Sequence, residues 1–128
     1  MYILYNYGFN NDVVDEMIDK VPEIQTLDDM EIVEKLALLE AANIETEVII
    51  DAVAENPEYL MGDTTDVAKL INALMTIGID DLGEVLTSNP MVLNCSYDDV
   101  EDFIEREYEC GYEMSEIIEM IKDGKLWR

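Results

Sequence analysis

Apolar residues recur at helical spacing along the chain, and three prolines divide this pattern into similar units. Apolar side chains stand eight, five and four residues before each of Pro22, Pro57 and Pro90. The three sets are Val14, Met17 and Ile18; Ile49, Ala52 and Val53; and Leu82, Val85 and Leu86. This i, i+3, i+4 spacing is typical of the buried face of an amphipathic helix. Because the residue before a proline disfavours the α conformation, we expect each helix to end there.

A second, longer helix is expected in each unit after the proline. A residue suited to cap a helix N-terminus stands six positions after each proline, and an acid follows three residues later. The cap residues are Asp28, Asp63 and Ser96, and the pair Asp28 and Glu31 comes closest to a capping box. The expected apolar stripes are Ile32, Leu36 and Leu39; Val67, Ile71 and Leu74; and Val100, Ile104 and Tyr108. The helices should end at Asn43, Gly78 and Gly111, because Asn and Gly tolerate a left-handed C-terminal cap.

The spacing of proline and Gly or Asn is constant along the chain. Each proline precedes the next such residue by the same 21 positions, from 22 to 43, from 57 to 78 and from 90 to 111. The sequence therefore predicts a single all-α domain over residues 1–128, a short α-solenoid of about three and a half repeats of 33–35 residues. The expected parts are a partial helix 1–7, repeats 8–42, 43–77 and 78–110, and a terminal half-repeat 111–128.

The unit resembles the repeat of the mitochondrial transcription termination factor (mTERF) family. The order is Gly-apolar, helix, Pro-x-x-Leu, cap, and a longer helix ending in Leu-x-x-x-Gly, clearest over residues 56–60, 73–79 and 85–93. The first copy departs from the pattern at Gln25, where the motif has Leu, and at Asn43, where it has Gly. The last half-unit has Gly124 to Trp127 in place of the proline. The resemblance implies a left-handed superhelix of three-helix units that binds nucleic acid along a basic concave groove.

The charge of the chain opposes that implied function. There are 31 acidic residues against 7 basic ones, and the formal net charge is −24. Nucleic-acid binding depends largely on cations that contact phosphates, so we expect no direct binding of nucleic acid and favour a basic protein partner. Five of the seven cations also have an acid one turn earlier. These predicted surface pairs are Glu16–Lys20, Glu31–Lys35, Asp66–Lys69, Asp102–Arg106 and Glu119–Lys122.

Catalytic and cofactor motifs are not found in the sequence. It contains no histidine, no phosphate-binding glycine loop, no nucleophile elbow and no calcium-loop spacing, so we predict a non-enzymatic protein without cofactor or metal. The methionines, the tyrosines and Cys110 are interpreted as core residues. The two cysteines suit reduced thiols, and neither a signal peptide nor a membrane span is recognised, so we expect a cytoplasmic protein.

The candidate contact residues are acids near the boundaries of the units, namely Asp80, Asp81, Asp98, Asp99 and Asp102. Trp127 is either a hydrophobic cap on the last helix or a partner contact. The main hypothesis is an acidic interaction module for a basic protein, in its sharpest form a nucleic-acid mimic or inhibitor. The alternative is a nucleic-acid-associated transcription regulator, as the resemblance implies. The sequence leaves the partner's identity and the oligomeric state open.

Overall fold

The computed structural model describes residues 2–125, and this part of the chain is helical throughout, with short connections and no strand. The helices are α1 (Tyr2–Tyr7), α2 (Asn11–Lys20), η1 (Pro22–Thr26), α3 (Asp29–Ala41), α4 (Thr46–Glu55), η2 (Pro57–Met61), α5 (Thr64–Thr76), α6 (Leu82–Ser88), η3 (Pro90–Asn94), α7 (Tyr97–Glu109) and α8 (Met114–Lys122), where η denotes a 3-10 helix.

Each repeat consists of an α-helix, a 3-10 helix that begins at the proline, and a longer α-helix. The first helices have Val21, Asn56 and Asn89 as their C-cap residues, each directly before a proline, so they end where the sequence predicts. Asn43 and Gly78 take positive φ values of 63° and 113° where the longer helices end, which confirms the predicted left-handed caps. The all-α repeat fold is therefore the one expected from the spacing of proline and glycine.

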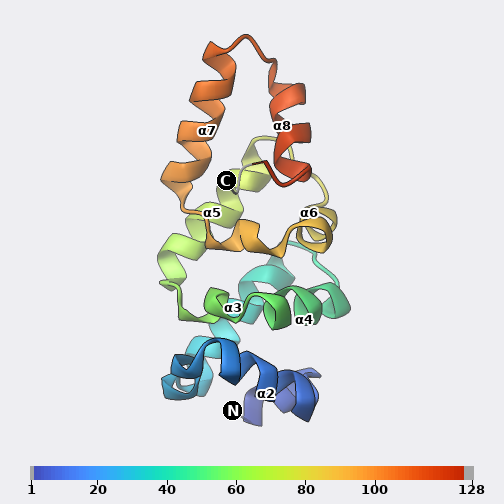
Figure 1. Ribbon diagram of the computed structural model, residues 1–128, viewed down its shortest axis with the longest axis vertical. Helices are drawn as coiled ribbons and strands as arrows, with labels where there is room; N and C mark the ends of the chain where they lie inside the picture. The colour runs from blue at the N-terminus through green and yellow to red at the C-terminus, as the bar shows by residue number, and fades with distance from the viewer. Residues whose placement is uncertain (1, 126–128) are drawn as a thin grey trace.

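Equivalent helices of successive repeats stack on one another. Helices α1, α3, α5 and α7 form one column, α2, α4, α6 and α8 form a second, and the three 3-10 helices form a third (Figure 1). Helices α7 and α8 form a hairpin whose connecting loop projects beyond α5 and α6 (Figure 1). Because neighbouring repeats share each column, every interior repeat packs on two others.

The three side chains predicted before each proline are buried or packed against the core. The stripe predicted for α7 is wrong at its third position, because Tyr108 is 67% exposed. Counted from the caps, Tyr108 aligns with the exposed residues Glu40 and Met75, whereas Glu107 aligns with the buried Leu39 and Leu74. A shift of one residue turns a side chain about 100° around a helix, which carries Tyr108 away from the core.

A buried polar contact joins the second and third repeats. Asn56 is 2% exposed, and its Nδ2 donates hydrogen bonds to the main-chain oxygen of Pro90 at 3.3 Å and to Oδ1 of Asn94 at 3.0 Å. The residue before the proline thus reaches across the repeat boundary to the next 3-10 helix. A buried amide with two partners fixes the relative position of the elements that supply them.

Lys35 is also buried, contrary to its predicted surface pairing with Glu31. It is 3% exposed, and its Nζ lies 3.5 Å from the main-chain oxygen of Leu60 in η2. The hydroxyl of Tyr59 donates a hydrogen bond of 2.6 Å to the main-chain oxygen of Lys35. Lys35 occupies the position that Leu70 and Phe103 occupy in α5 and α7, so it faces the next repeat and not the solvent.

Candidate functional site

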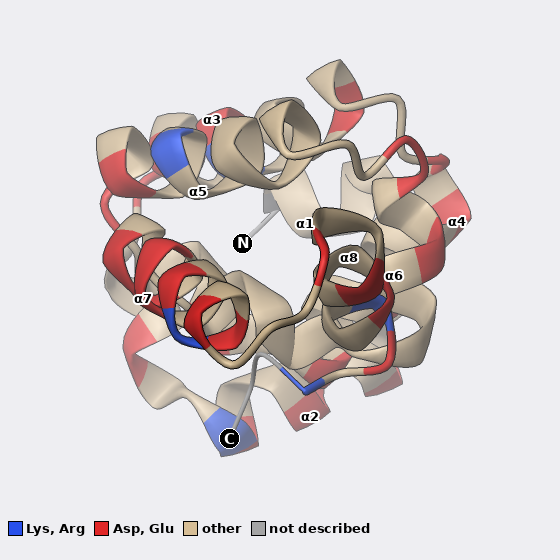
Figure 2. Ribbon diagram, turned by 90° about the horizontal axis from the view of Figure 1, so that it is seen from above, with Lys and Arg blue, Asp and Glu red and all other residues tan. Residues whose placement is uncertain are grey.

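Acidic residues occur on most of the helices, whereas Lys and Arg are few and widely separated (Figure 2). The sequence has no Lys or Arg in residues 36–68 or in residues 70–105. Helices α4 and α6 therefore carry acids without a cation on either helix. Since these two helices pack together in the second column, neither of them supplies a cation to balance the acids on their shared face.

A groove runs along the contact of α4 with α6. It is formed by two adjoining cavities of about 440 and 540 Å³, which share Val48 and Thr87 in their linings. Seven carboxylates line it, from Glu45, Glu47, Asp51, Glu55, Asp80, Asp81 and Glu84. Among the described residues that line it there is no Lys or Arg. In this groove Asp80 and Asp81, two acids predicted from the sequence, meet acids of the preceding repeat.

The structure separates the five predicted contact acids into two groups. Asp80 and Asp81 line the α4–α6 groove, and Oδ1 of Asp81 also accepts a hydrogen bond of 3.1 Å from the amide of Glu84. Asp98, Asp99 and Asp102 lie in the first turns of α7, on the opposite side of the molecule from α6 in Figure 2.

The acids of α7 differ in what they do locally. Asp99 and Ser96 form a reciprocal capping box: the amide of Ser96 donates to Oδ2 of Asp99 at 2.8 Å, and the amide of Asp99 donates to Oγ of Ser96 at 3.1 Å. The sequence pattern had placed the closest match to a capping box at Asp28. There the side chain accepts a hydrogen bond of 3.0 Å from the amide of Glu31, but the reciprocal bond is not formed. Asp98 and Asp102 are exposed and free to face a partner surface. Trp127 lies outside the described residues.

Most of the predicted ion pairs are not formed. Within residues 2–125 the pair Glu119–Lys122 is present at 3.7 Å, whereas Arg106 contacts Glu107 at 3.6 Å and not Asp102. Arg106 also lies over the ring of Phe103, with 5.5 Å between Cζ and the ring centroid. Together with the burial of Lys35, these contacts leave no stripe of unpaired cations on the described surface.

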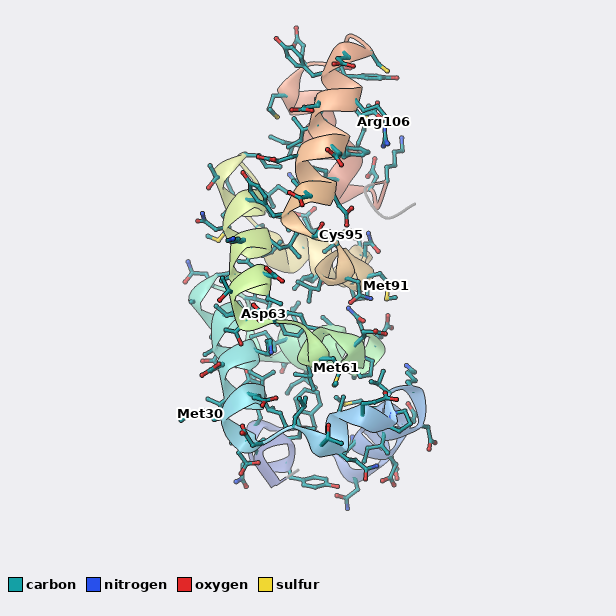
Figure 3. All side chains as sticks on the ribbon, turned by 90° about the vertical axis from the view of Figure 1, so that its left-hand side faces the viewer. Met30, Met61, Asp63, Met91, Cys95 and Arg106 are labelled. Carbon is teal, nitrogen blue, oxygen red and sulfur yellow. The ribbon has the colours of Figure 1, made fainter. Side chains whose placement is uncertain are left out.

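A second groove lies where η2 and the start of α5 meet η3 and the start of α7, and its cavity measures about 610 Å³. Figure 3 shows Met61, Asp63, Met91 and Cys95 on this face. Burial, and to a lesser extent the charge of Asp99, raises the pKa of the Cys95 thiol to about 11. A thiol with this pKa is protonated near neutral pH, so it is a packing group and not a nucleophile.

Several residues interpreted as core are exposed. Met17 is fully buried, but Met30 is 67% exposed, Met61 37% and Met75 42%. Cys110 is exposed as well, because it caps α7 at the projecting end of the α7–α8 hairpin. Met61, Met91 and the acids of α4 were not among the contact residues predicted from the sequence. The absence of cations in residues 36–68 was the one available signal for the acidic groove, whereas nothing in the spacing distinguishes an exposed methionine from a buried one.

The described part of the chain forms neither a metal site nor a membrane-spanning helix. In residues 2–125 no group of three or more Cys, Asp and Glu side chains is placed to hold a metal ion. None of the helices in the same part of the chain has the length and apolar character needed to cross a membrane. The candidate site is therefore a charged surface with two grooves.

The fold and this surface together define an all-α helical-repeat protein built from three-helix units. The model of the mTERF family matches residues 2–124, and the chain belongs to this family. The mTERF family is a non-enzymatic, nucleic-acid-binding repeat family, so the protein is not an enzyme. No curated protein matches the chain.

Proposed function

We propose that the protein is an interaction module that binds a basic protein surface through its acidic helix faces. The observation that carries the proposal is the α4–α6 groove, where seven carboxylates from two repeats converge and none of the described lining residues is Lys or Arg. Electrostatic complementarity of this kind speeds association and selects partners of opposite charge. A nucleic-acid-binding protein is the most suitable partner class, because its phosphate-binding surface is basic.

The test is capture of basic proteins from the native host, followed by elution with salt. We expect capture at low ionic strength and loss as added salt shortens the screening length. A groove variant, Glu47→Gln with Asp51→Asn and Glu84→Gln, should weaken capture. The control variant changes the same number of charges on α2, at the exposed residues Asp15, Glu16 and Asp19. Capture that is indifferent to salt and to the groove variant leaves the charge as a solubility feature.

A second variant in the same capture experiment tests the acids of α7. Asp98→Asn with Asp102→Asn removes two exposed charges and leaves the Ser96–Asp99 capping box intact. If this variant weakens capture as much as the groove variant does, the partner contacts both sides of the molecule. If it has no effect, the α4–α6 groove alone forms the contact.

Membership of the mTERF family supports a second candidate function, a nucleic-acid-associated transcription regulator. Its direct form requires cations that reach phosphates, and the described cations include the buried Lys35 and the paired Arg106 and Lys122. Its indirect form acts through a basic nucleic-acid-binding partner, which the chain would displace from DNA or RNA as a nucleic-acid mimic. Fluorescence anisotropy with duplex DNA and duplex RNA separates the two. Micromolar binding at physiological salt would favour the direct form, whereas competition for the captured partner would favour the indirect one.

A further inference from the structure

The groove between η2–α5 and η3–α7 has an apolar floor, and methionine side chains form its edges. Tyr59, Leu70 and Leu93 form part of the floor and are nearly inaccessible, at 2%, 1% and 4% exposure. Met61 is 37% exposed, and Met91 is partly buried (Figure 3). Methionine is flexible and polarizable, and it is over-used on surfaces that adapt to apolar partners. An open apolar concavity edged by methionines is thus suited to accept an apolar side chain.

The rim of this groove is acidic. Glu58, Asp63 and Asp66 line it, and the described lining contains no Lys or Arg. Asp63 caps α5, since its Oδ1 accepts bonds from the amides of Thr65 and Asp66 at 2.9 and 3.2 Å. Glu58 lies near the start of η2 and Asp66 in the first turn of α5, and both are exposed. Cations beside a seated apolar side chain would face these carboxylates.

We propose that this groove binds a Lys- and Arg-rich segment of a partner protein by seating one of its apolar side chains between Met61 and Met91. The flanking cations of the segment then lie against Glu58 and Asp66. This inference rests on the proposed function and adds the part of the partner that is recognised. The α4–α6 groove attracts a basic surface by charge, whereas this groove also selects a segment that carries an apolar anchor.

The charge of the molecule selects this occupant over others that would fit an apolar groove. A second copy of the chain would bring another net charge of −24 to an acidic rim. A nucleic acid would bring phosphates to the same carboxylates. A basic segment is the one macromolecular occupant whose charge complements the rim and whose apolar side chain matches the floor.

The test uses two fluorescent synthetic peptides with the same number of lysines. One has a central Leu-Leu pair, and the other has Ser-Ser in its place. We expect the Leu-Leu peptide to bind about tenfold more tightly, because the loss of an anchor residue typically changes affinity by that order. Met61→Gln with Met91→Gln should abolish this preference. The control, Met30→Gln with Met75→Gln, alters two methionines that are 67% and 42% exposed and lie outside the groove.

Methyl NMR of the wild-type protein provides a readout that needs no variant at the site. With the methionine methyl groups labelled with ¹³C, the Leu-Leu peptide should shift the signals of Met61 and Met91 and leave those of Met30 and Met75 unchanged. The matched charge variants are Glu58→Gln with Asp66→Asn in this groove and Glu47→Gln with Glu84→Gln in the α4–α6 groove. Only the first pair should reduce the preference for the Leu-Leu peptide.

The outcomes separate the two proposals. If neither peptide binds at low salt, the proposed function fails and the inference fails with it. If both peptides bind equally, with strong salt dependence and no shift of Met61 or Met91, the proposed function stands and the inference is overturned. If the Met61 and Met91 signals shift with protein concentration alone, the groove is an interface between two copies, which also overturns it.

Discussion

The phenol of Tyr59 lies in the core and is the donor to the main-chain oxygen of Lys35 at 2.6 Å. Burial raises the pKa of Tyr59 above its ordinary value of 10.0. Burial likewise raises the pKa values of Tyr7, with a further contribution from Glu40, and of Cys95. These groups are protonated in the folded protein over a pH range in which the unfolded chain releases their protons. The linkage between protonation and folding then acts at alkaline pH.

We expect the Tyr59→Phe variant to respond less to alkaline pH than the wild type. The contribution of the Tyr59 phenol is fully present below the unfolded pKa of about 10 and is lost as pH rises through the folded value. At pH 7 the variant should lose about 0.5–1.5 kcal/mol of stability with the hydrogen bond. Urea unfolding between pH 7 and 11 measures both effects, and Tyr5→Phe, at a residue 39% exposed, is the control. An unchanged alkaline slope in Tyr59→Phe would contradict this account.

The two cysteines should differ in their reaction with a thiol-specific disulfide reagent. Cys110 is exposed, whereas Cys95 is buried and its pKa is raised to about 11. At pH 8 we expect Cys110 to be modified rapidly and Cys95 slowly, and both to react quickly in denaturant. Peptide mass spectrometry after timed quenching assigns the two sites. Equal rates in the folded protein would show that Cys95 is accessible through the groove it lines.

At the scale of the element, stability should depend on position in the stack. Leu74 and Leu4 are both 0% exposed, but Leu74 belongs to α5, which packs on α3 and α7, whereas Leu4 belongs to α1, which packs on α3. We expect Leu74→Ala to cost about 2–5 kcal/mol. Leu4→Ala should cost less, because a terminal element has one neighbour in its column. Denaturant unfolding measures both, and equal losses would be inconsistent with a stacked array.

The sequence predicts where the helices begin and end better than it predicts which of their side chains are buried. Pro57 and Gly78 act locally, since one ends a helix and the other permits a positive φ, so their positions reveal the helix ends. The burial of Lys35 depends on the oxygen of Leu60 in the next repeat, which no local pattern contains. The exposure of Tyr108 follows from a shift of one residue in helical register.

The acidic character of the candidate site was predictable from the sequence, but the location of the groove was not. Asp80 and Asp81 are recognisable as acids, but the groove they line also needs Glu47 and Asp51 from the preceding repeat. Which acids meet is decided by how α6 packs on α4, a contact between segments far apart in the sequence. The same holds for Met61, which lines the second groove together with Met91 of the next repeat.

At the scale of the whole molecule, a net charge of −24 implies repulsion among the carboxylates of the folded chain. We expect added sodium chloride to raise the melting temperature at pH 7, by roughly 3–6 °C for each kcal/mol of repulsion that it screens. The control is the same series near the sequence pI of about 4.1, where the net charge vanishes and the salt effect should shrink. Thermal unfolding followed by circular dichroism provides the measurement. A melting temperature that is independent of salt at pH 7 would show that the acids are spaced widely enough to avoid repulsion.

The amide contact of Asn56 has a consequence for exchanging the repeats. Asn56 donates a hydrogen bond to Asn94 of the next unit. One unit earlier, the residue aligned with Asn56 is Val21 and the residue aligned with Asn94 is Met61, and both are apolar. Deleting residues 43–77 would preserve every helix length and every loop. It would nevertheless set Val21 opposite Asn94 and leave the amide of Asn94 facing a side chain that cannot bond to it. The units share the same order of helices, but the contact at a unit boundary depends on a specific pair of residues. A shortened or reordered array therefore requires both residues of the pair to be exchanged together.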